Sequence, residues 1–328
     1  MILLKKSIHI LPPLDGSLHK GQSGRVGVVG GSRDYTGAPF FSSYAALRLG
    51  ADLSHVICDP IASTVIKTYS PDLIVHSFLS SSKDQSLYKT HQDEFKELIS
   101  RLHVLVIGPG LGRDQEMQDW AKFAIEICKE LNLFIVLDAD ALWLIQSDPD
   151  IIRNYKKAIL TPNHVEFQRL LKSCSIETTD HQSETDLAKR LSKSLGGCTI
   201  LQKGFNDIIA CDGYDSIIID TEGSPKRCGG QGDILSGLVG TWLAWGKLYL
   251  DKQTTNLDQI NGEDEKIKQE EITLISASLG SKITRTCSNL AFDQFGRSMQ
   301  TSDMLNFINE SFKIVYKSLL NDEKLSKM

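Results

Sequence analysis

The segment best suited to chemistry is a glycine-rich loop, residues 223–233, which ends in an aspartate and leads into an apolar stretch. Gly229, Gly230 and Gly232 lack side chains, so a ligand can approach the main chain closely. The helix expected from Ile234 onward presents unpaired N–H groups and the positive end of its dipole, which together suit a phosphate group. Asp233 lies at the edge of that site, where a carboxylate can take a proton from a hydroxyl that attacks phosphorus.

An ordinary loop with Asp233 as its helix cap is the alternative interpretation of this segment. Lys226 and Arg227 lie close enough in the sequence to contribute positive charge to a phosphate site. The three glycines, the basic pair and the apolar helix that follows in register therefore favour phosphate binding over a simple cap.

A second candidate site, residues 161–169, follows the apolar segment 158–160. Asn163 and Glu166 are three residues apart, so they share one face of a first helical turn at the carboxyl end of a parallel strand, where α/β sheets bind ligands. Glu166 has two possible roles, as the N3 member of a capping box or as a carboxylate that holds the waters of Mg²⁺. One carboxylate cannot fully serve both, so the alternatives stay open.

Three more segments end expected strands with residues suited to a ligand. Residues 108–113 form a glycine turn against which a ligand can lie, although a turn that needs positive φ explains two of the three glycines and is an equally good interpretation. Asp138 and Asp140 end another strand, and we expect one of them to cap the next helix. Lys203, followed by Gly204, can meet a nucleotide phosphate or ribose, although a solvated turn lysine is the commoner case.

The glycines at 27–32 and the histidines give weaker evidence for a functional site. Residues 27–32 are rich in glycine but lack the G-x-G-x-x-G spacing, so they support a Rossmann dinucleotide site only weakly. The 8 histidines form no i, i+4 pair and no cluster with cysteines or carboxylates at metal-ligand spacing. His164 alone lies in a candidate site, where we expect packing or a minor contact.

The elements that must position these residues alternate along the chain. Short apolar runs separated by helical patterns predict βαβ units, a mostly parallel sheet and helices on both of its faces. The gap rich in Gly and Asp at 212–215 predicts an antiparallel hairpin at the end of that sheet. The expected strands are 25–29, 53–58, 74–76, 104–107, 133–137, 158–160, 199–201, 207–211 and 216–220. The expected helices are 39–49, 92–101, 116–131, 141–146, 165–174, 185–195, 234–245, 271–287 and 303–319.

Composition limits the class of protein. The chain has 328 residues, 41% hydrophobic and 23% charged, which indicates one globular α/β domain over residues 1–328, with a polar surface insertion at 251–271. Its net charge of −5 argues against a nucleic-acid partner. The 7 scattered cysteines indicate reduced thiols. No apolar run is long enough to span a membrane, and we expect a cytoplasmic protein, with a mitochondrial form as the alternative.

The motifs taken together resemble the ATP-dependent NAD(P)H-hydrate dehydratase family. The resemblance runs in order through segments 30–39, 108–112, 138–142, 161–167 and 229–233, and it covers essentially the whole chain. It implies a ribokinase-like fold with three α/β/α layers. It also implies a repair reaction, in which ATP phosphorylates the C6 hydroxyl of (6S)-hydrated NADH or NADPH and phosphate is then eliminated, restoring the double bond and releasing ADP and phosphate.

The resemblance also implies residue roles. Asp233 would deprotonate the hydroxyl, the N–H groups of Gly230, Gln231 and Gly232 would stabilise the transferring phosphoryl group, and Glu166, with Asn163, would hold Mg²⁺, Glu166 through water. The hydrated dinucleotide would contact Gly112, Asn163, His164, Val165, Glu166, Phe167, Gln168, Arg169 and Asp233. ATP would contact Lys203, Gly204, Phe205, Asn206, Asp207, Gly223, Ser224, Pro225, Lys226, Arg227, Cys228, Gly229, Gly230, Gln231 and Gly232.

Many bacterial relatives carry an N-terminal epimerase domain, but here the match begins near Gly21, so a separate NAD(P)H-hydrate epimerase is the expected functional partner. A homo-oligomer is left open. The rival functions are a ribokinase-like kinase of a vitamin or sugar alcohol, a catalytically silent nucleotide-binding regulator and a nicotinamide oxidoreductase. The kinase would use the same Asp233, whereas the regulator would not need this base and the oxidoreductase would not need ATP.

Overall fold

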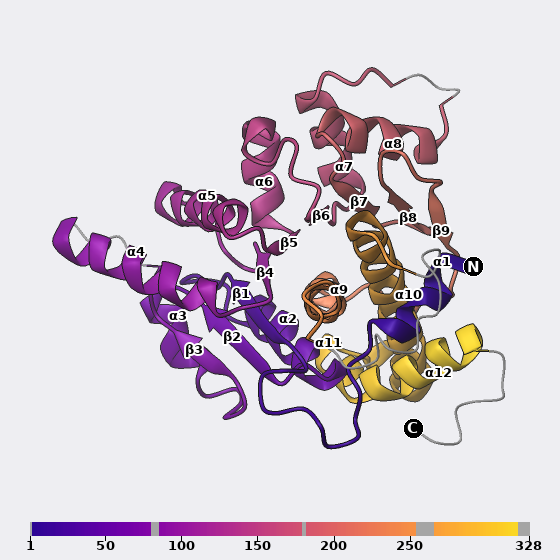
Figure 1. The fold of residues 1–328 in the computed structure, drawn as a ribbon, viewed down its shortest axis with the longest axis horizontal. Coiled ribbons are helices and arrows are strands. Elements are labelled where there is room, and N and C mark those ends of the chain that lie inside the picture. Colours follow the sequence, from indigo (N-terminus) through magenta and orange to yellow (C-terminus); the bar gives the residue numbers. More distant parts are fainter. Residues whose placement is uncertain (1, 80–84, 179–181, 254–265, 321–328) are drawn as a thin grey trace.

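The chain folds around a single nine-stranded sheet in the order β3-β2-β1-β4-β5-β6-β7-β8-β9 (Figure 1). The computed structural model describes residues 2–79, 85–178, 182–253 and 266–320. The strands are β1 Arg25–Val29, β2 Leu53–Ile57, β3 Ile74–His76, β4 Val104–Ile107, β5 Phe134–Leu137, β6 Ala158–Leu160, β7 Thr199–Gln202, β8 Asp207–Ala210 and β9 Ile217–Ile219. All nine expected strands are therefore present, with ends that differ by at most one residue from the predicted ones.

The strands from β3 through β7 run parallel to their neighbours, and β7, β8 and β9 pair antiparallel. The prediction of a mostly parallel sheet with an added hairpin is confirmed. Every residue of β4, β5, β6 and β7 is buried, which is why these segments read as continuous apolar runs and not as alternating ones.

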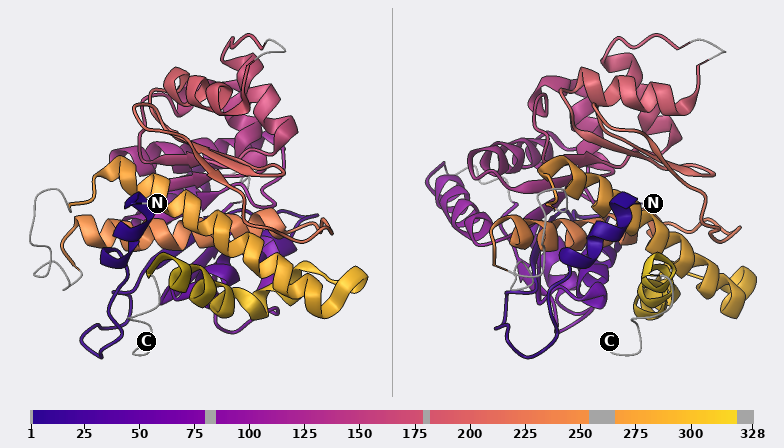
Figure 2. Two further views of the ribbon diagram at one scale, coloured as in Figure 1. Left: turned by 90° about the vertical axis from the view of Figure 1, so that its right-hand side faces the viewer. Right: turned by 45° about the vertical axis from the view of Figure 1, so that its right-hand side comes forward.

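Helices cover both faces of the sheet and give the fold three layers (Figures 1 and 2). One face packs against α2 Gly37–Leu49, α9 Gln231–Leu250, α10 Gln269–Phe295 and α12 Ile308–Leu320, where Trp242 and Val239 lie in the core. The other face packs against α4 Gln85–Ser100, α5 Gln115–Glu130, α6 Asp140–Ser147, α7 His164–Ser173 and α8 Glu184–Ser194, where Trp120 and Phe95 are buried.

The helices differ from the prediction in several places. Helices α4 and α9 begin earlier than expected, and α10 continues to Phe295, well beyond its expected end at 287. Helix α3 Pro60–Ile66 was not predicted, although Asp59 caps it by accepting a hydrogen bond from Ile61 N at 2.7 Å and Pro60 fills its first position. The helix expected at 303–319 is divided into α11 Thr301–Met304, a 3₁₀ turn at Leu305–Phe307 and α12. The chain also begins with two short turns, α1 Ile2–Lys5 and a 3₁₀ turn at Lys6–His9.

The polar stretch expected at 251–271 lies largely outside the described residues, which stop at 253 and resume at 266. Its described ends differ in environment, since residues 251–253 are exposed and Ile267 is buried against α9 and α10. Among the helices that the structure describes, none carries an apolar stretch long enough to cross a bilayer.

Candidate active site

The carboxyl ends of β5, β6 and β7 bring three polar side chains into contact at one edge of the sheet. Asp138 follows β5 and is almost fully buried, with 1% of its surface exposed. One of its carboxylate oxygens accepts hydrogen bonds from Thr161 Oγ1 at 2.8 Å and from Lys203 Nζ at 2.9 Å. Each residue comes directly after a buried strand, so the parallel register places them side by side.

The amino end of α9 points into this edge. Its first main-chain hydrogen bond runs from Ile234 N to Gly230 O at 3.1 Å, so the N–H groups of Gln231 and Gly232 are not used by the helix. Gly230 is the N-cap and has φ of 100°, a conformation that favours glycine. A Cβ placed on Gly232 would lie 3.4 Å from Lys203 Nζ, which shows how closely the helix start approaches the ion pair.

Asp233 lies inside the first turn of α9 and is not its cap, because the helix begins three residues earlier than predicted. The simple-cap alternative is therefore wrong. Burial, helped by the neighbouring Asp138 carboxylate and opposed by the Lys203 ammonium, raises the pKa of Asp233 to about 7. A carboxylate with a pKa near neutrality is well matched to general-base work.

Lys203 is paired and largely enclosed, and the expectation of a solvated turn lysine is wrong. Its side chain is 22% exposed and that of Asp138 is 2% exposed. Burial lowers the pKa of Lys203, but the carboxylates of Asp138 and Glu166 outweigh burial and raise it overall. Lys203 therefore stays charged beside the helix start, where an incoming phosphate would meet both.

Asn163 and Glu166 form the capping box that was one of the two alternatives. Glu166 N donates to Asn163 Oδ1 at 3.0 Å, and Asn163 N donates to Glu166 Oε2 at 2.8 Å. Burial raises the pKa of Glu166, and Lys203 opposes that shift. Within the described residues, the second carboxylate oxygen of Glu166 receives no hydrogen bond, so the cap leaves one oxygen available.

The oxygens of Asn163 and Glu166 suit a Mg²⁺ ion that keeps most of its waters, and not one enclosed by protein ligands. No group of three or more His, Cys, Asp or Glu residues in the described part of the chain has the geometry of a metal cage. Mg²⁺ keeps most of its waters and commonly binds through one or two carboxylates and the substrate phosphates. The single available oxygen of Glu166 suits that mode. The metal role of Asn163 stays a prediction, because its amide oxygen is engaged in the cap.

Neither Asp138 nor Asp140 caps α6, so that expectation is wrong. The N-cap is Ala139, which has φ of 48° and makes no side-chain cap. Asp140 instead accepts a hydrogen bond from Gly112 N at 3.0 Å and pairs with Arg113 Nε at 3.1 Å. The carboxylate therefore holds the turn that follows β4 against the start of α6.

The glycines at 27–32 and 108–112 allow two loops to touch. Gly31 N donates to the carbonyls of Pro109 and Gly110, each at 3.1 Å. A Cβ on Gly30 would lie 2.0 Å from Pro109 O, which no side chain tolerates. The close loop contact explains Gly30 without a dinucleotide fingerprint.

The residues expected to border the hydrated dinucleotide separate into two groups. His164, Val165, Gln168 and Arg169 are exposed along the first turns of α7. Phe167 is fully buried in the core beneath that helix, so its side chain serves packing. A helix alternates between core and solvent within one turn, and a continuous binding segment therefore includes core positions.

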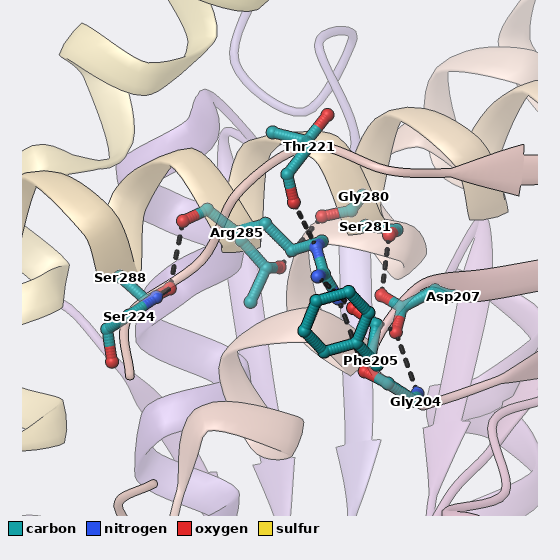
Figure 3. A network of polar contacts seen from close by, with 10 residues as sticks. Gly204, Phe205, Asp207, Thr221, Ser224, Gly280, Ser281, Arg285 and Ser288 are labelled. Atoms are coloured by element: carbon teal, nitrogen blue, oxygen red, sulfur yellow. Dashed lines mark hydrogen bonds and ion pairs between the residues drawn. The ribbon is translucent and has the colours of Figure 1, made fainter. Parts of the chain in front are cut away.

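The turn at 203–207 is held from α10 (Figure 3). Asp207 accepts hydrogen bonds from Gly204 N at 3.0 Å and Ser281 Oγ at 2.7 Å, and it pairs with Arg285 Nη1 at 3.1 Å. Arg285 also donates to the carbonyls of Gly204, Phe205 and Thr221. This arrangement leaves Phe205 89% exposed, and the Asp207 carboxylate is bonded to groups of the protein itself.

The loop at 223–230 is fastened by α10 and by the segment that follows it. Ser224 N donates to Ser288 Oγ at 3.0 Å, as Figure 3 shows, and Thr301 Oγ1 donates to Gly229 O at 2.6 Å. The Lys226 ammonium donates to two main-chain carbonyls at 297–299, each at 2.6 Å, so its charge faces those carbonyls. Arg227 is exposed.

Helix α10 has a role in the site that was not predicted from the sequence. Ser281, Arg285 and Ser288 lie at i, i+4 and i+7, so one face of this helix holds both segments expected to bind ATP. The available signal was a polar stripe in an otherwise apolar helix. The pairing of Asp138 with Lys203 was also missed, because residues 65 positions apart cannot be matched by spacing.

The fold is that of ribokinase-like proteins. A ribokinase-like superfamily protein from Enterococcus faecalis superposes with a TM-score of 0.69 and 21% identity, over 95% of this chain and 94% of that one. An ADP/ATP-dependent NAD(P)H-hydrate dehydratase from Bacillus subtilis, co-crystallised with ATP and Mg²⁺, superposes with a TM-score of 0.62 and 20% identity, over 93% and 97% of the two chains.

The chain belongs to the NAD(P)H-hydrate dehydratase family, whose model matches residues 26–310. ATP-dependent (S)-NAD(P)H-hydrate dehydratase 2 of Puccinia graminis f. sp. tritici is 62% identical over 95% of this chain and 90% of its own length. The ATP-dependent (S)-NAD(P)H-hydrate dehydratase of Homo sapiens is 41% identical over 94% of this chain and 83% of its own. The family resemblance seen in the sequence is confirmed.

Proposed function

We propose that this ATP-dependent NAD(P)H-hydrate dehydratase, a hydro-lyase, repairs hydrated NADH and NADPH with Asp233 as its general base. The observation that carries the proposal is the position of Asp233 in the first turn of α9, beside the unused N–H groups of Gln231 and Gly232 and the charged Lys203. A base, an anion cradle and a cation thus share one edge of the sheet. This combination suits phosphoryl transfer from ATP to an alcohol.

In the first step, Asp233 removes the proton of the C6 hydroxyl as its oxygen bonds to the γ-phosphorus of ATP. The bond between that phosphorus and the bridging oxygen breaks, and ADP leaves. The N–H groups of Gly230, Gln231 and Gly232 face the charge that builds on the transferring phosphoryl oxygens. Lys203 adds a fixed positive charge to the same region.

In the second step, the phosphorylated ring loses phosphate. The C6–O bond breaks and phosphate leaves with its electron pair, the neighbouring ring carbon gives up a proton to water, and the double bond of the reduced nicotinamide returns. Phosphate is a far better leaving group than hydroxide, which explains why the dehydration needs ATP. Because the same cradle binds the departing phosphate, elimination can follow at the same site.

The proposed ligand positions follow the edge of the sheet. The turn at 203–207 and the loop at 223–232 lie toward β7 and β9, and both are held by α10, which supports their assignment to ATP. Gly112 and the exposed residues of 163–169 lie toward β4 and β6, and we assign them to the hydrated dinucleotide. Glu166, between the two groups, would hold Mg²⁺ through water, and the ion would neutralise phosphate charge.

A kinase that releases a stable phosphate ester is the second candidate, because it would use the same base and cradle. The decisive experiment follows the absorbance of reduced nicotinamide at about 340 nm when enzyme, ATP and Mg²⁺ meet acid-hydrated NADH. We expect the absorbance to return only when ATP is present. Folded, ATP-binding protein that gives no return would favour the kinase.

Three wider proposals remain. A separate NAD(P)H-hydrate epimerase would supply the S epimer that this enzyme uses. A homo-oligomer would be detected by light scattering. All 7 cysteines are free, with no disulfide in the structure, which supports a reducing compartment such as the cytoplasm or the mitochondrial matrix.

A further inference from the structure

Two arginines, one from a loop and one from a helix, lie over one indole ring near the expected dinucleotide site. The guanidinium carbon of Arg113 is 4.4 Å from the ring centroid of Trp143, and that of Arg169 is 5.7 Å away. Arg113 follows the turn after β4, Trp143 is on α6 after β5, and Arg169 is on α7 after β6. The segments that follow three neighbouring strands therefore each contribute one residue to the cluster.

The charges in this cluster do not cancel. Arg113 pairs with Asp140 at 3.1 Å, and its side chain is still 57% exposed. Arg169 is exposed, and among the described residues no carboxylate forms an ion pair with it. Two guanidinium groups around one ring repel each other, and Asp140 offsets only one of them. The cluster therefore carries an uncompensated positive charge that a bound anion would relieve.

We propose that Arg113, Trp143 and Arg169 form a phosphate-binding subsite for the dinucleotide part of the substrate. The proposal rests on the function proposed above and adds to it the recognition of one chemical group. The planar fork of a guanidinium binds phosphate oxygens in pairs, which a lysine cannot do. Contact with the indole restricts each guanidinium before the ligand arrives, so less entropy is lost on binding.

The location separates this subsite from the one proposed for ATP. The cluster spans the ends of β4, β5 and β6, whereas the turn at 203–207 follows β7 and is held by α10. Asp140 joins the cluster to Gly112 through the hydrogen bond from Gly112 N at 3.0 Å. A ligand lying along the 108–112 turn would thus meet Arg113 at the next residue.

A hydrated dinucleotide offers phosphate from two sources. Both hydrated NADH and hydrated NADPH carry the bridging diphosphate, and only hydrated NADPH carries a 2′-phosphate. A subsite for the diphosphate would serve both substrates equally. A subsite for the 2′-phosphate would serve hydrated NADPH alone and would set the preference between the two coenzymes.

The test compares KM for both hydrates in the wild-type enzyme, Arg169→Ala and Trp143→Leu. Arg169→Ala is the cleaner variant because it leaves no carboxylate of the cluster unpaired. Arg101→Ala is the matched control: the Arg101 side chain is 61% exposed, forms a long ion pair of 3.9 Å with Glu97, and lies just after α4 and before β4 begins. Product binding, followed by NADPH and NADH fluorescence without ATP, provides a readout that does not depend on turnover.

We expect Arg169→Ala to raise KM for at least one hydrate roughly tenfold or more and to weaken binding of the matching product, with KM for ATP unchanged. An equal rise for both hydrates assigns the diphosphate, and a rise for hydrated NADPH alone assigns the 2′-phosphate. Trp143→Leu should move KM in the same direction, and Arg101→Ala should stay within about twofold of wild type.

Unchanged KM and unchanged product binding in a folded, active Arg169→Ala variant would overturn the subsite and leave the proposed function intact. Failure of the proposed function would be distinct, since the wild-type enzyme itself would then not restore the absorbance of reduced nicotinamide.

Discussion

The ammonium nitrogen of Lys203 lies 2.9 Å from a carboxylate oxygen of Asp138, beside the first turn of the helix that carries Asp233. The pair couples the ends of β5 and β7 to the start of α9. It fixes one negative and one positive charge near the proposed base, and these act on its pKa in opposite directions. The almost fully buried Asp138 carboxylate thus raises the pKa of Asp233.

The first prediction concerns the pH dependence of activity. The pKa of Asp233 is about 7 and a general base must be ionised, so kcat/KM should rise with pH through that region and then level off. Asp138→Asn removes the neighbouring negative charge and should move this acidic limb to lower pH. Thr161→Val is the control, because it removes the hydrogen bond of 2.8 Å to Asp138 and no charge. An unmoved limb in Asp138→Asn would contradict the coupling.

The same substitution should also destabilise the fold. Asp138→Asn leaves the largely enclosed ammonium of Lys203 without its closest partner, which costs about 3 kcal/mol or more at buried ion pairs. Urea unfolding near neutral pH measures this loss. A free energy of unfolding equal to that of wild type would show that the pair is not structurally important.

The second prediction follows from the sign of the Asp233 shift. Its pKa in the folded state is raised from 3.8 to about 7, so between these values the folded chain binds more protons at this group than the unfolded chain does. The contribution of Asp233 to stability therefore falls as pH rises through this window. Asp233→Asn should raise Tm relative to wild type more at about pH 8 than at about pH 5. An equal difference at both pH values would contradict the shift.

The third prediction separates the two roles of Glu166. Glutamine preserves the hydrogen bond from Asn163 N and removes the charge, so Glu166→Gln should change the free energy of unfolding by no more than about 1 kcal/mol. If Glu166 also holds Mg²⁺, the concentration of Mg²⁺ needed for half-maximal rate should rise roughly tenfold or more. An unaltered Mg²⁺ requirement would leave Glu166 with its capping role alone.

The fourth prediction concerns Arg285, which lies under both segments assigned to ATP (Figure 3). Arg285→Lys keeps the charge but loses most of the hydrogen bonds to the carbonyls of Gly204, Phe205 and Thr221. We expect KM for ATP to rise several-fold while KM for the hydrate is unchanged, because the dinucleotide side has separate supports. A parallel rise of both constants would indicate general loosening of the fold.

The fold could be predicted well because its strands are buried on both faces. Segments such as 104–107 and 134–137 are short apolar runs that are typical of strands buried on both faces. The helical patterns between them indicate that consecutive strands are connected through helices and run parallel. The short helix α3 was not predicted because 7 residues show too little hydrophobic periodicity, although Asp59 followed by Pro60 is a typical start of a helix.

The site was predicted in part. The glycine loop with Asp233 and the capping box of Asn163 and Glu166 could be predicted, because the residues of each motif are close together in the sequence. The partner of Lys203 and the role of Arg285 depend on strands and helices meeting in space, which spacing along the chain cannot show. The residues that shift the pKa of Asp233 are likewise distant from it in the sequence, so spacing could not identify them.

The central claim is that Asp233 is the base for phosphoryl transfer, and Asp233→Asn tests it most directly. Single-turnover return of reduced-nicotinamide absorbance and ATP binding by calorimetry should be measured on the same preparation of the variant and of wild type. We expect ATP affinity within about threefold of wild type and a rate lower by about a thousandfold or more, since base and positioning effects combine. A rate close to that of wild type in a variant that binds ATP would contradict the account.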